Sequence, residues 1–288
     1  MSASSSAINS RFRGYIVPRL TGGVDHPASI VETTSMAGIL PPPLTTRLAL
    51  PYQIAQQGLL SSVQLERVAY AAQAHETKLP SGARSGLMVG DGTGVGKGRC
   101  LAGIILHHWH AGTRRSLWLS ASNDLHVAAR QDFDDLGATY IPVRNLNEWG
   151  VEQLITLAEG VIFATFNALI SQSKDGASTR FAQLTQWLAG DDGQAVIVID
   201  ESQKAKNAVG ECFGKLEAAS QTGKAIVALQ SEVNFPNFRI VYSSATGYTE
   251  LRNMGYLTRL GLWGQGTSFQ DFSDFQREIG GAGISGME

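Results

Sequence analysis

The sequence has few cysteines, few charged residues and little net charge. Cys100 and Cys212 are its two cysteines in 288 residues, too few for a disulfide framework and typical of a reducing compartment. Charged residues make up 17% and hydrophobic residues 43%, a balance that argues against a disordered chain. The net charge of −2 provides no bulk positive field, so any contact with a polyanion has to come from a local patch.

Long hydrophobic runs are also missing. The longest aliphatic runs resemble residues 195–199, AVIVI, whereas a membrane-spanning helix needs ~20 apolar residues. Residues 1–10 are polar and lack the apolar core of a signal peptide. We therefore expect a cytoplasmic protein with no membrane partner. The length of 288 residues fits about two domains, or one α/β domain with an extra segment.

The first 51 residues differ from the rest of the chain. They hold most of the prolines, namely Pro18, Pro27, Pro41, Pro42, Pro43 and Pro51. Proline fixes φ and removes a hydrogen-bond donor, and consecutive prolines favour an extended chain. We predict that residues 1–51 form an arm wrapped on the domain or a linker from a preceding one, the linker being preferred. Residues 52–288 are then the globular domain.

From residue 52 on, short apolar runs alternate with helical stretches. The predicted strands are 87–89, 116–119, 140–143, 161–164, 195–199 and 239–242, and the predicted helices are 61–75, 97–110, 124–136 and 181–188. This alternation is typical of a mostly parallel sheet covered by helices on both faces. The predicted fold class is α/β.

A glycine-rich loop, GDGTGVGKG at residues 90–98, lies between a predicted strand and a predicted helix. Strand, loop, Gly-Lys and helix in this order are the context of a phosphate-binding loop. Glycines let backbone N–H groups face a polyphosphate, and the helix N-terminus adds partial positive charge. The residues placed to contact the nucleotide are Gly92, Thr93, Gly94, Val95, Gly96, Lys97 and Gly98.

This loop departs from the common pattern G-x-x-x-x-G-K-[ST] at two positions. Asp91 stands in place of the first glycine, and Gly98 stands in place of the serine or threonine. Gly98 has no hydroxyl for Mg²⁺, so carboxylates, water and phosphate oxygens would have to hold the metal. We expect Asp91 either to point away from the anion or to help to hold the metal.

A second motif is the hydrophobic strand 196–199 followed by Asp200 and Glu201. This is a Walker B arrangement, in which Asp200 would hold Mg²⁺ and Glu201 would polarise the attacking water. A third, 243–247 (SSATG), follows the strand 239–242. Cys100 and three histidines share one predicted helix, but no cysteine pair stands at zinc spacing, so we predict no zinc site.

The order Gly-Lys, Asp-Glu and Ser-Ala-Thr resembles superfamily 2 helicases and translocases. More closely, GDGTGVGKGR at 90–99, DESQKAKN at 200–207, SATG at 244–247 and LGLWGQGT at 260–267 resemble the strawberry notch family. The resemblance covers residues 57–288, includes the unusual Gly98 and adds Arg99 to the nucleotide-binding set. It implies the first RecA-like P-loop NTPase domain of a motor.

The resemblance also assigns roles to further residues. Gln64 would read adenine, although an exposed helical glutamine is an alternative. Ser244 and Thr246 would relay the nucleotide state, and Ser122, Asn123 and Thr165 would contact the nucleic-acid backbone. Gln203 stands where the family has histidine; it can donate and accept hydrogen bonds but carries no charge.

The predicted function is Mg²⁺-dependent ATP hydrolysis by a motor domain acting on nucleic acid, DNA more than RNA. We expect a second RecA-like domain in cis or trans, since the motifs of one domain are present, and slow turnover by the chain alone. The alternative is a nucleotide-gated interaction module of a larger DNA-modification or regulatory assembly, without unwinding. A small-molecule kinase ranks below both, because such kinases usually keep the hydroxyl that Gly98 lacks.

Overall fold

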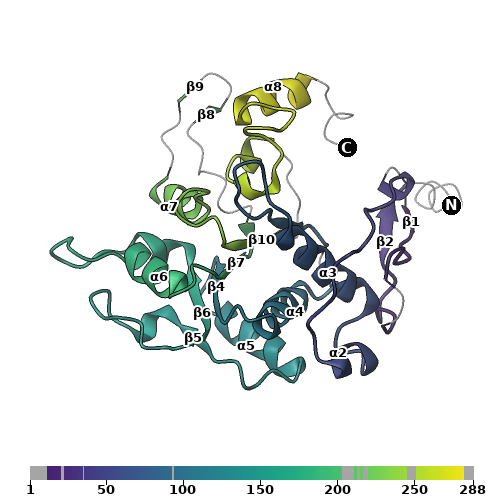
Figure 1. Ribbon diagram of the computed structural model, residues 1–288, viewed down its shortest axis with the longest axis horizontal. Helices are drawn as coiled ribbons and strands as arrows, with labels where there is room; N and C mark the ends of the chain where they lie inside the picture. Colours follow the sequence, from purple (N-terminus) through teal and green to yellow (C-terminus); the bar gives the residue numbers. More distant parts are fainter. Residues whose placement is uncertain are drawn as a thin grey trace, which may run out of the picture.

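A computed structural model describes residues 12–20, 23–34, 36–92, 94–202, 211–212, 215–216, 220–244 and 251–281. Its centre is a sheet of six parallel strands (Figure 1). In sheet order these are β3 (Leu87–Val89), β10 (Arg239–Ser243), β7 (Val196–Ile199), β4 (Arg115–Ser120), β6 (Gly160–Thr165) and β5 (Val143–Asn145). Parallel strands end at one edge of the sheet, so all their carboxyl ends face the same way.

Helices cover both faces of this sheet, because the central strands are apolar on both sides. In β7, Val196 and Val198 belong to one buried cluster, while Ile197 and Ile199 belong to the other. The first cluster packs under α3, α4 and α5, and the second under α6 and α7 (Figure 1). The α-helices are α2 (Tyr52–Gln56), α3 (Ser62–Glu76), α4 (Lys97–His110), α5 (Leu125–Asp135), α6 (Arg180–Ala189), α7 (Gln221–Leu229) and α8 (Phe272–Gly281).

The shorter elements lie mainly outside the sheet. They are β1 (Phe12–Gly14), β2 (Val31–Thr33), β8 (Glu211–Cys212), β9 (Lys215–Leu216), and the 3₁₀ turns η1 (Met36–Gly38), η2 (Leu146–Glu148), η3 (Phe166–Ile170), η5 (Leu251–Met254) and η6 (Thr258–Leu260). Across the described ranges, no helix has the length and apolar character needed to cross a membrane.

The predicted α/β class is confirmed, and the central sheet is parallel throughout. Five predicted strands lie within one or two residues of their observed bounds, but the prediction for 140–143 is wrong. The strand there is β5, which starts at Val143. Pro142 has no N–H to give to the sheet, and Tyr140 is 53% exposed. Helices α2, α7 and α8 were not predicted.

The arm is tied to α3 by hydrogen bonds from its described residues. The Gln73 side chain accepts from the Thr45 backbone N–H at 2.7 Å and donates to the Pro43 carbonyl at 3.1 Å. The Tyr15 hydroxyl donates to the buried Glu66 carboxylate at 2.5 Å. The arm also contains the short antiparallel pair β1–β2, an element that the proline content did not predict.

Three buried histidines, His75, His107 and His108, pack against one another in tilted and edge-on arrangements. The Nε2 atom of His75 lies 3.2 Å from the Ile240 carbonyl, and its Nδ1 lies 2.8 Å from Nε2 of His108. A carbonyl only accepts, so His75 carries its proton on Nε2 and accepts from His108. The Ala49 N–H donates to Nδ1 of His107 at 2.9 Å. Burial lowers the pKa of His75 to about 3 and that of His108 in the same direction, so both are neutral at pH 7.

These histidines make the fold acid-sensitive. A histidine in the unfolded chain has a pKa near 6.5. Below that pH, His75 binds a proton in the unfolded chain but stays neutral in the native protein. The contribution of neutral His75 to the free energy of unfolding is therefore complete above about pH 6.5 and is lost progressively as the pH falls toward 3. From pH 7 to pH 5 we expect His75 alone to cost about 2 kcal/mol.

Urea unfolding of the wild type and of His75→Asn at both pH values measures this loss. The variant starts less stable but should lose about 2 kcal/mol less between pH 7 and pH 5. The Asp132 carboxyl, whose pKa is raised, has the opposite pH dependence but is present in both proteins and cancels. Equal losses in the two proteins would contradict the assignment.

Arg259, in the turn η6, is a fully buried cation that binds the turn before β10. Its guanidinium donates to the carbonyls of Gln230, Ser231 and Phe235 at 2.7, 3.1 and 2.6 Å. It also donates to the Arg84 carbonyl at 3.1 Å. Burial lowers its pKa. The charge is therefore spread over backbone acceptors of the 230–238 turn.

Replacing Arg259 by methionine should destabilise the protein by about 3 kcal/mol, because several buried carbonyls lose their donor at once. The matched control is Arg277→Met, on α8, where the arginine side chain is 69% exposed and pairs with Asp274. An exposed pair of this kind contributes less than ~1 kcal/mol. Urea midpoints for the two variants should differ clearly, and similar midpoints would refute the structural role of Arg259.

Candidate functional site

The motif residues meet at the carboxyl edge of the sheet. The 90–98 loop leaves β3, Asp200 and Glu201 leave β7, and Ser243 and Ser244 close β10 between them. Val89 pairs with Ser243, and Ile199 pairs with Tyr242. Three segments far apart in sequence thus end side by side, where ligands of open α/β sheets bind.

The loop adopts a conformation that needs its glycines. Gly94 and Gly96 have φ of 91° and 75°, in the left-handed region, and Gly96 directly precedes α4. The first N–H groups of α4 therefore open toward the loop. Lys97 Nζ donates to the carbonyls of Asp91 and Gly92, each at 3.0 Å, so the ammonium lies across the loop. Thr93 is outside the described residues.

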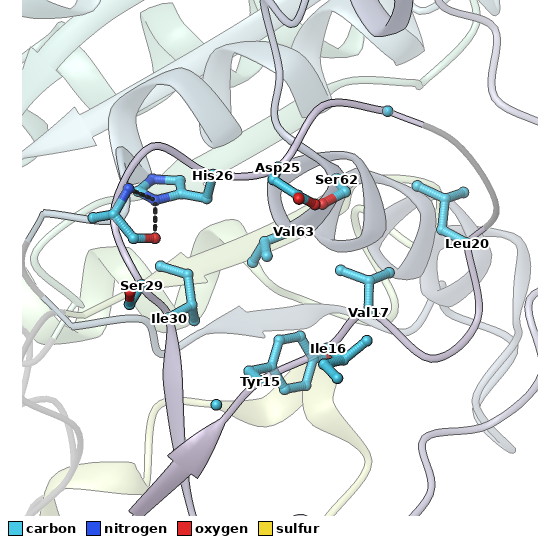
Figure 2. A pocket seen from close by; sticks show the side chains of 13 residues that line it. Tyr15, Ile16, Val17, Leu20, Asp25, His26, Ser29, Ile30, Ser62 and Val63 are labelled. Carbon is cyan, nitrogen blue, oxygen red and sulfur yellow. Dashed lines mark hydrogen bonds between the residues drawn. The ribbon is translucent and has the colours of Figure 1, made fainter.

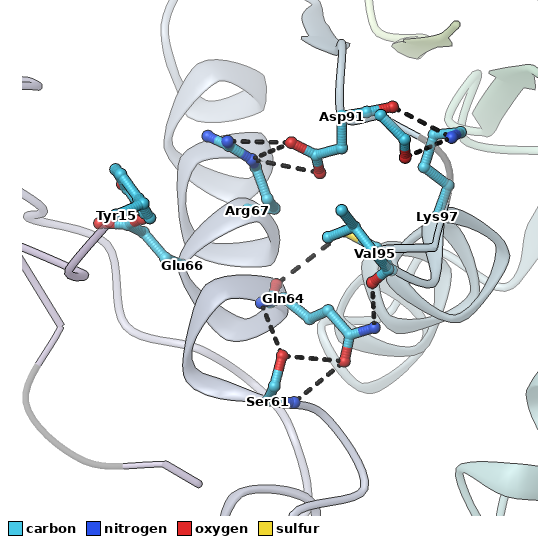
Figure 3. Close-up of polar contacts among 10 residues, drawn as sticks. Tyr15, Ser61, Gln64, Glu66, Arg67, Asp91, Val95 and Lys97 are labelled. Carbon is cyan, nitrogen blue, oxygen red and sulfur yellow. Dashed lines mark hydrogen bonds and ion pairs between the residues drawn. The ribbon is translucent and has the colours of Figure 1, made fainter. Parts of the chain in front are cut away.

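Gln64 is tied to the loop rather than exposed on its helix. Its Nε2 donates to the Val95 carbonyl at 2.9 Å and to the Gly96 carbonyl at 3.2 Å (Figure 3). Its Oε1 accepts from the Ser61 N–H at 3.0 Å, which closes a capping box at the start of α3. A Cβ at Gly96 would lie 2.6 Å from Nε2. The alternative of an exposed glutamine is wrong, since Gln64 is 7% exposed; adenine reading stays a prediction.

Asp91 faces α3, away from the lysine side chain (Figure 3). Its carboxylate accepts two hydrogen bonds from Arg67, at 3.2 Å from Nε and 3.0 Å from Nη2. The carboxylate is 11% exposed. Its charge is therefore neutralised by Arg67, which explains how a phosphate loop tolerates an aspartate here. Of the two expectations for Asp91, its pairing fits the one in which it points away.

Asp200 is held at the end of β7 by two donors on one oxygen. The Ser243 hydroxyl and the Glu201 N–H each donate to Oδ1 at 3.0 Å. Burial raises the pKa of Asp200, while these hydrogen bonds and one from the Trp118 side chain oppose the rise. Glu201 has a φ of 53°, a conformation that costs a non-glycine residue energy and is found mainly at functional sites.

Gly98 faces a carboxylate that the sequence motifs did not predict. A Cβ built on Gly98 would lie 2.1 Å from Oδ2 of Asp132, a residue of α5. Burial raises the pKa of Asp132 to about 6; Arg99 lowers it, and the charges of Asp135 and Asp200 raise it. Arg99 itself forms an ion pair with Asp135. Since α5 is distant in sequence, only the fold brings Asp132 to the loop.

The residues present suit a magnesium nucleotide. Carboxylate oxygens are preferred ligands of Mg²⁺, and the lack of a side chain at Gly98 leaves a cradle in which Asp132 lies. The buried Ser244 hydroxyl has no partner among the described residues. The described ranges contain no group of three or more His, Cys, Asp and Glu side chains arranged to hold a metal, so phosphate and water would complete the coordination.

The remaining predicted residues fall into two sets. Gln203 and Thr246 lie outside the described residues. Ser122 and Asn123 follow β4, and Thr165 is the last residue of the neighbouring strand β6, where it pairs with Ser120 of β4. Asn123 Oδ1 accepts from the Asn145 side chain at 2.7 Å. The structure therefore groups these three residues at the carboxyl ends of β4 and β6, away from β3 and the 90–98 loop.

A pocket of about 580 Å³ lies elsewhere, between the arm and the start of α3 (Figure 2). Its lining includes Tyr15, Ile16, Asp25 and His26 of the arm, with Ser62 and Val63 of α3. His26 Nδ1 lies within hydrogen-bond distance of Ala28. None of the described residues of the 90–98 loop lines it.

A parallel α/β sheet with a Gly-Lys loop at one strand end and Asp-Glu at another defines a P-loop NTPase of RecA-like fold. A model of the family "P-loop containing NTP hydrolase pore-1" matches residues 25–288. The chain belongs to this family, and it is clearly homologous to strawberry notch proteins.

Three relatives show the extent of this homology. The chain is 43% identical over 281 residues to human "Protein strawberry notch homolog 1", covering 95% of this chain and 20% of that protein. It is 41% identical over 285 residues to Drosophila melanogaster "Protein strawberry notch", covering 96% and 17%. It is 42% identical over 281 residues to Arabidopsis thaliana "Protein FORGETTER 1", covering 96% and 21%. The chain thus spans about a fifth of each relative.

Proposed function

We propose that this chain is the ATP-binding and Mg²⁺-dependent ATP-hydrolysing domain of a superfamily 2 helicase-like motor. The observation that carries the proposal is the placement of the Lys97 loop, which follows β3, and of Asp200 and Glu201, which follow β7, at the same edge of the sheet with only β10 between the two strands. A cation on a glycine-rich loop beside two acids is the minimum set for hydrolysis of a nucleoside triphosphate.

Each group has a distinct task in this proposal. Lys97 and the first amides of α4 bind the β and γ phosphates, for which Lys97 gives up its two loop carbonyls. Asp200 holds Mg²⁺, which when bound neutralises charge on the phosphate oxygens. Glu201 accepts a proton from the attacking water. Gln64 fixes the loop from below through the Val95 and Gly96 carbonyls.

Nucleic acid is the proposed track, with DNA favoured over RNA. Ser122, Asn123 and Thr165 present short polar side chains at the carboxyl edge, and such groups contact phosphates without reading sequence. Ser244 follows β10, between the loop after β3 and this end of the edge. The proposal gives Ser244 and Thr246 the task of relaying the nucleotide state. A second RecA-like domain, in cis or trans, would add an arginine finger, worth ~10³-fold or more in phosphoryl transfer.

The test is phosphate release from ATP with and without single-stranded DNA, duplex DNA or single-stranded RNA. The motor proposal expects slow release that one of the nucleic acids accelerates. ATP binding with no acceleration by any of them would favour the alternative, a nucleotide-gated interaction module. Loss of ATP without free phosphate, dependent on a small acceptor, would indicate a kinase.

A further inference from the structure

The structure leaves one question at the loop: which group replaces the hydroxyl that Gly98 lacks. In ordinary phosphate loops this serine or threonine is a ligand of Mg²⁺. Here the volume that its side chain would occupy is taken by Asp132, whose Oδ2 is 2.1 Å from the position of a Cβ on Gly98. Glycine at 98 and aspartate at 132 are therefore sterically linked, since no larger residue fits at 98 while Asp132 keeps this position.

Asp132 is placed as a ligand would be. It is half-buried on the face of α5 that packs against α4. Within the described part of the chain, no hydrogen bond or ion pair is formed by its carboxylate, whereas Asp134 and Asp135 on the same helix pair with Arg130 and Arg99. A half-buried carboxylate left without a donor is costly unless a cation joins it.

We propose that the Asp132 carboxylate is a ligand of the nucleotide-bound Mg²⁺, in the place of the missing hydroxyl. The inference rests on the proposed function, because it needs a magnesium nucleotide at the loop. Asp200 would hold the ion from the end of β7, which β10 separates from the loop strand β3, and Asp132 would hold it from α5. A hard divalent cation prefers such oxygen ligands, and two carboxylates with phosphate and water suit its octahedral shell.

The proposal makes opposite predictions with and without the metal. With Mg²⁺, Asp132→Asn removes a charged ligand and should weaken nucleotide binding. Without Mg²⁺, the same change removes a negative charge beside the phosphates and should strengthen binding. A residue that only packs α5 against α4 would weaken binding in both conditions. The sign change therefore separates a ligand from a packing residue.

The experiment titrates the chain with a fluorescent ATP analogue in excess Mg²⁺ and in EDTA. In Asp132→Asn the strengthening by Mg²⁺ should fall at least about tenfold from the wild-type value. Binding of Mn²⁺ to the complex of Asp132→Asn with ADP, followed by electron paramagnetic resonance, should be weakened as well. Asp134→Asn is the matched control, with the same charge change on the same helix, and should behave as wild type. Urea midpoints confirm that the variants fold.

A two-residue exchange gives a second, independent readout. Gly98→Ser alone should weaken nucleotide binding, because its Cβ meets the Asp132 carboxylate. Gly98→Ser combined with Asp132→Ala removes the collision and supplies a hydroxyl, so the Mg²⁺ dependence should return. Asp132→Cys should move the preference from Mg²⁺ toward Cd²⁺, since thiolates favour softer metals.

Failure of the ligand assignment and failure of the proposed function give different results. If the wild type binds the analogue in a Mg²⁺-dependent way and Asp132→Asn does so equally, the ligand assignment is overturned while the proposed function stands. If the wild type binds no nucleotide in either condition, the proposed function falls and takes the assignment with it.

Discussion

Replacing Glu201 by glutamine is expected to lower the rate of ATP hydrolysis by about 10²–10⁴-fold while ATP still binds. The amide has nearly the shape of the carboxylate but cannot accept the proton of the attacking water. Glu201 lies two residues beyond the end of β7, and its backbone N–H donates to the Asp200 carboxylate. The substitution leaves that N–H in place, so the Asp200 carboxylate keeps its orientation and the metal its ligand.

Single-turnover phosphate release, together with an ATP binding titration, measures both halves of this expectation. Glu159→Gln is the matched control. Glu159 is half-exposed beside Arg114, and it precedes β6 at the amino-terminal edge of the sheet, opposite the edge that carries the motif residues. Hydrolysis by Glu201→Gln at more than a tenth of the wild-type rate would mean that another group activates the water.

Replacing Lys97 by alanine is expected to weaken ATP binding by about 10²–10³-fold. The reason is the loss of a charge-assisted hydrogen bond to phosphate in a partly desolvated site, worth roughly 2–5 kcal/mol. Among the described residues, Lys97 Nζ donates to two loop carbonyls, those of Asp91 and Gly92. The fold does not depend on these contacts, so the free energy of unfolding should change by less than ~0.5 kcal/mol.

Fluorescence titration with an ATP analogue and urea unfolding give the two values. Lys174→Ala, an exposed lysine on the loop after η3, should leave both unchanged. An unchanged ATP affinity in Lys97→Ala would contradict the phosphate-binding role of the loop. A large loss of stability would show that Lys97 has a structural task instead.

Local patterns predicted much of the sheet and its helices. Helix α3 was predicted because Ser61 or Ser62 can cap a helix ahead of an apolar stripe, and the structure shows Ser61 as the cap, in a capping box with Gln64. Helix α4 was predicted because a Gly-Lys step precedes an apolar run. The strand at 196–199 was predicted because four apolar β-branched residues stand together. These signals are local, so one window of sequence contains them.

The parts that were not predicted depend on contacts between distant residues. Asp132 belongs to a helix whose sequence gives no sign that it ends beside Gly98; the signal that could have found it is the absent hydroxyl, which requires a substitute from elsewhere. The pairing of Asp91 with Arg67 decided between two expectations that the loop sequence left open. The proline content indicated a linker, and it gave no sign of the hydrogen bonds by which the arm contacts α3, because those depend on residues distant in sequence.

The central claim is that the 90–98 loop binds a nucleoside triphosphate with Mg²⁺. Isothermal titration of the chain with ATP in excess Mg²⁺ tests it most directly. The account predicts saturable binding of one ATP per chain, weakened in EDTA and displaced by ADP more strongly than by adenosine, because the phosphates carry the contacts. No saturable binding, or equal competition by adenosine, would contradict it.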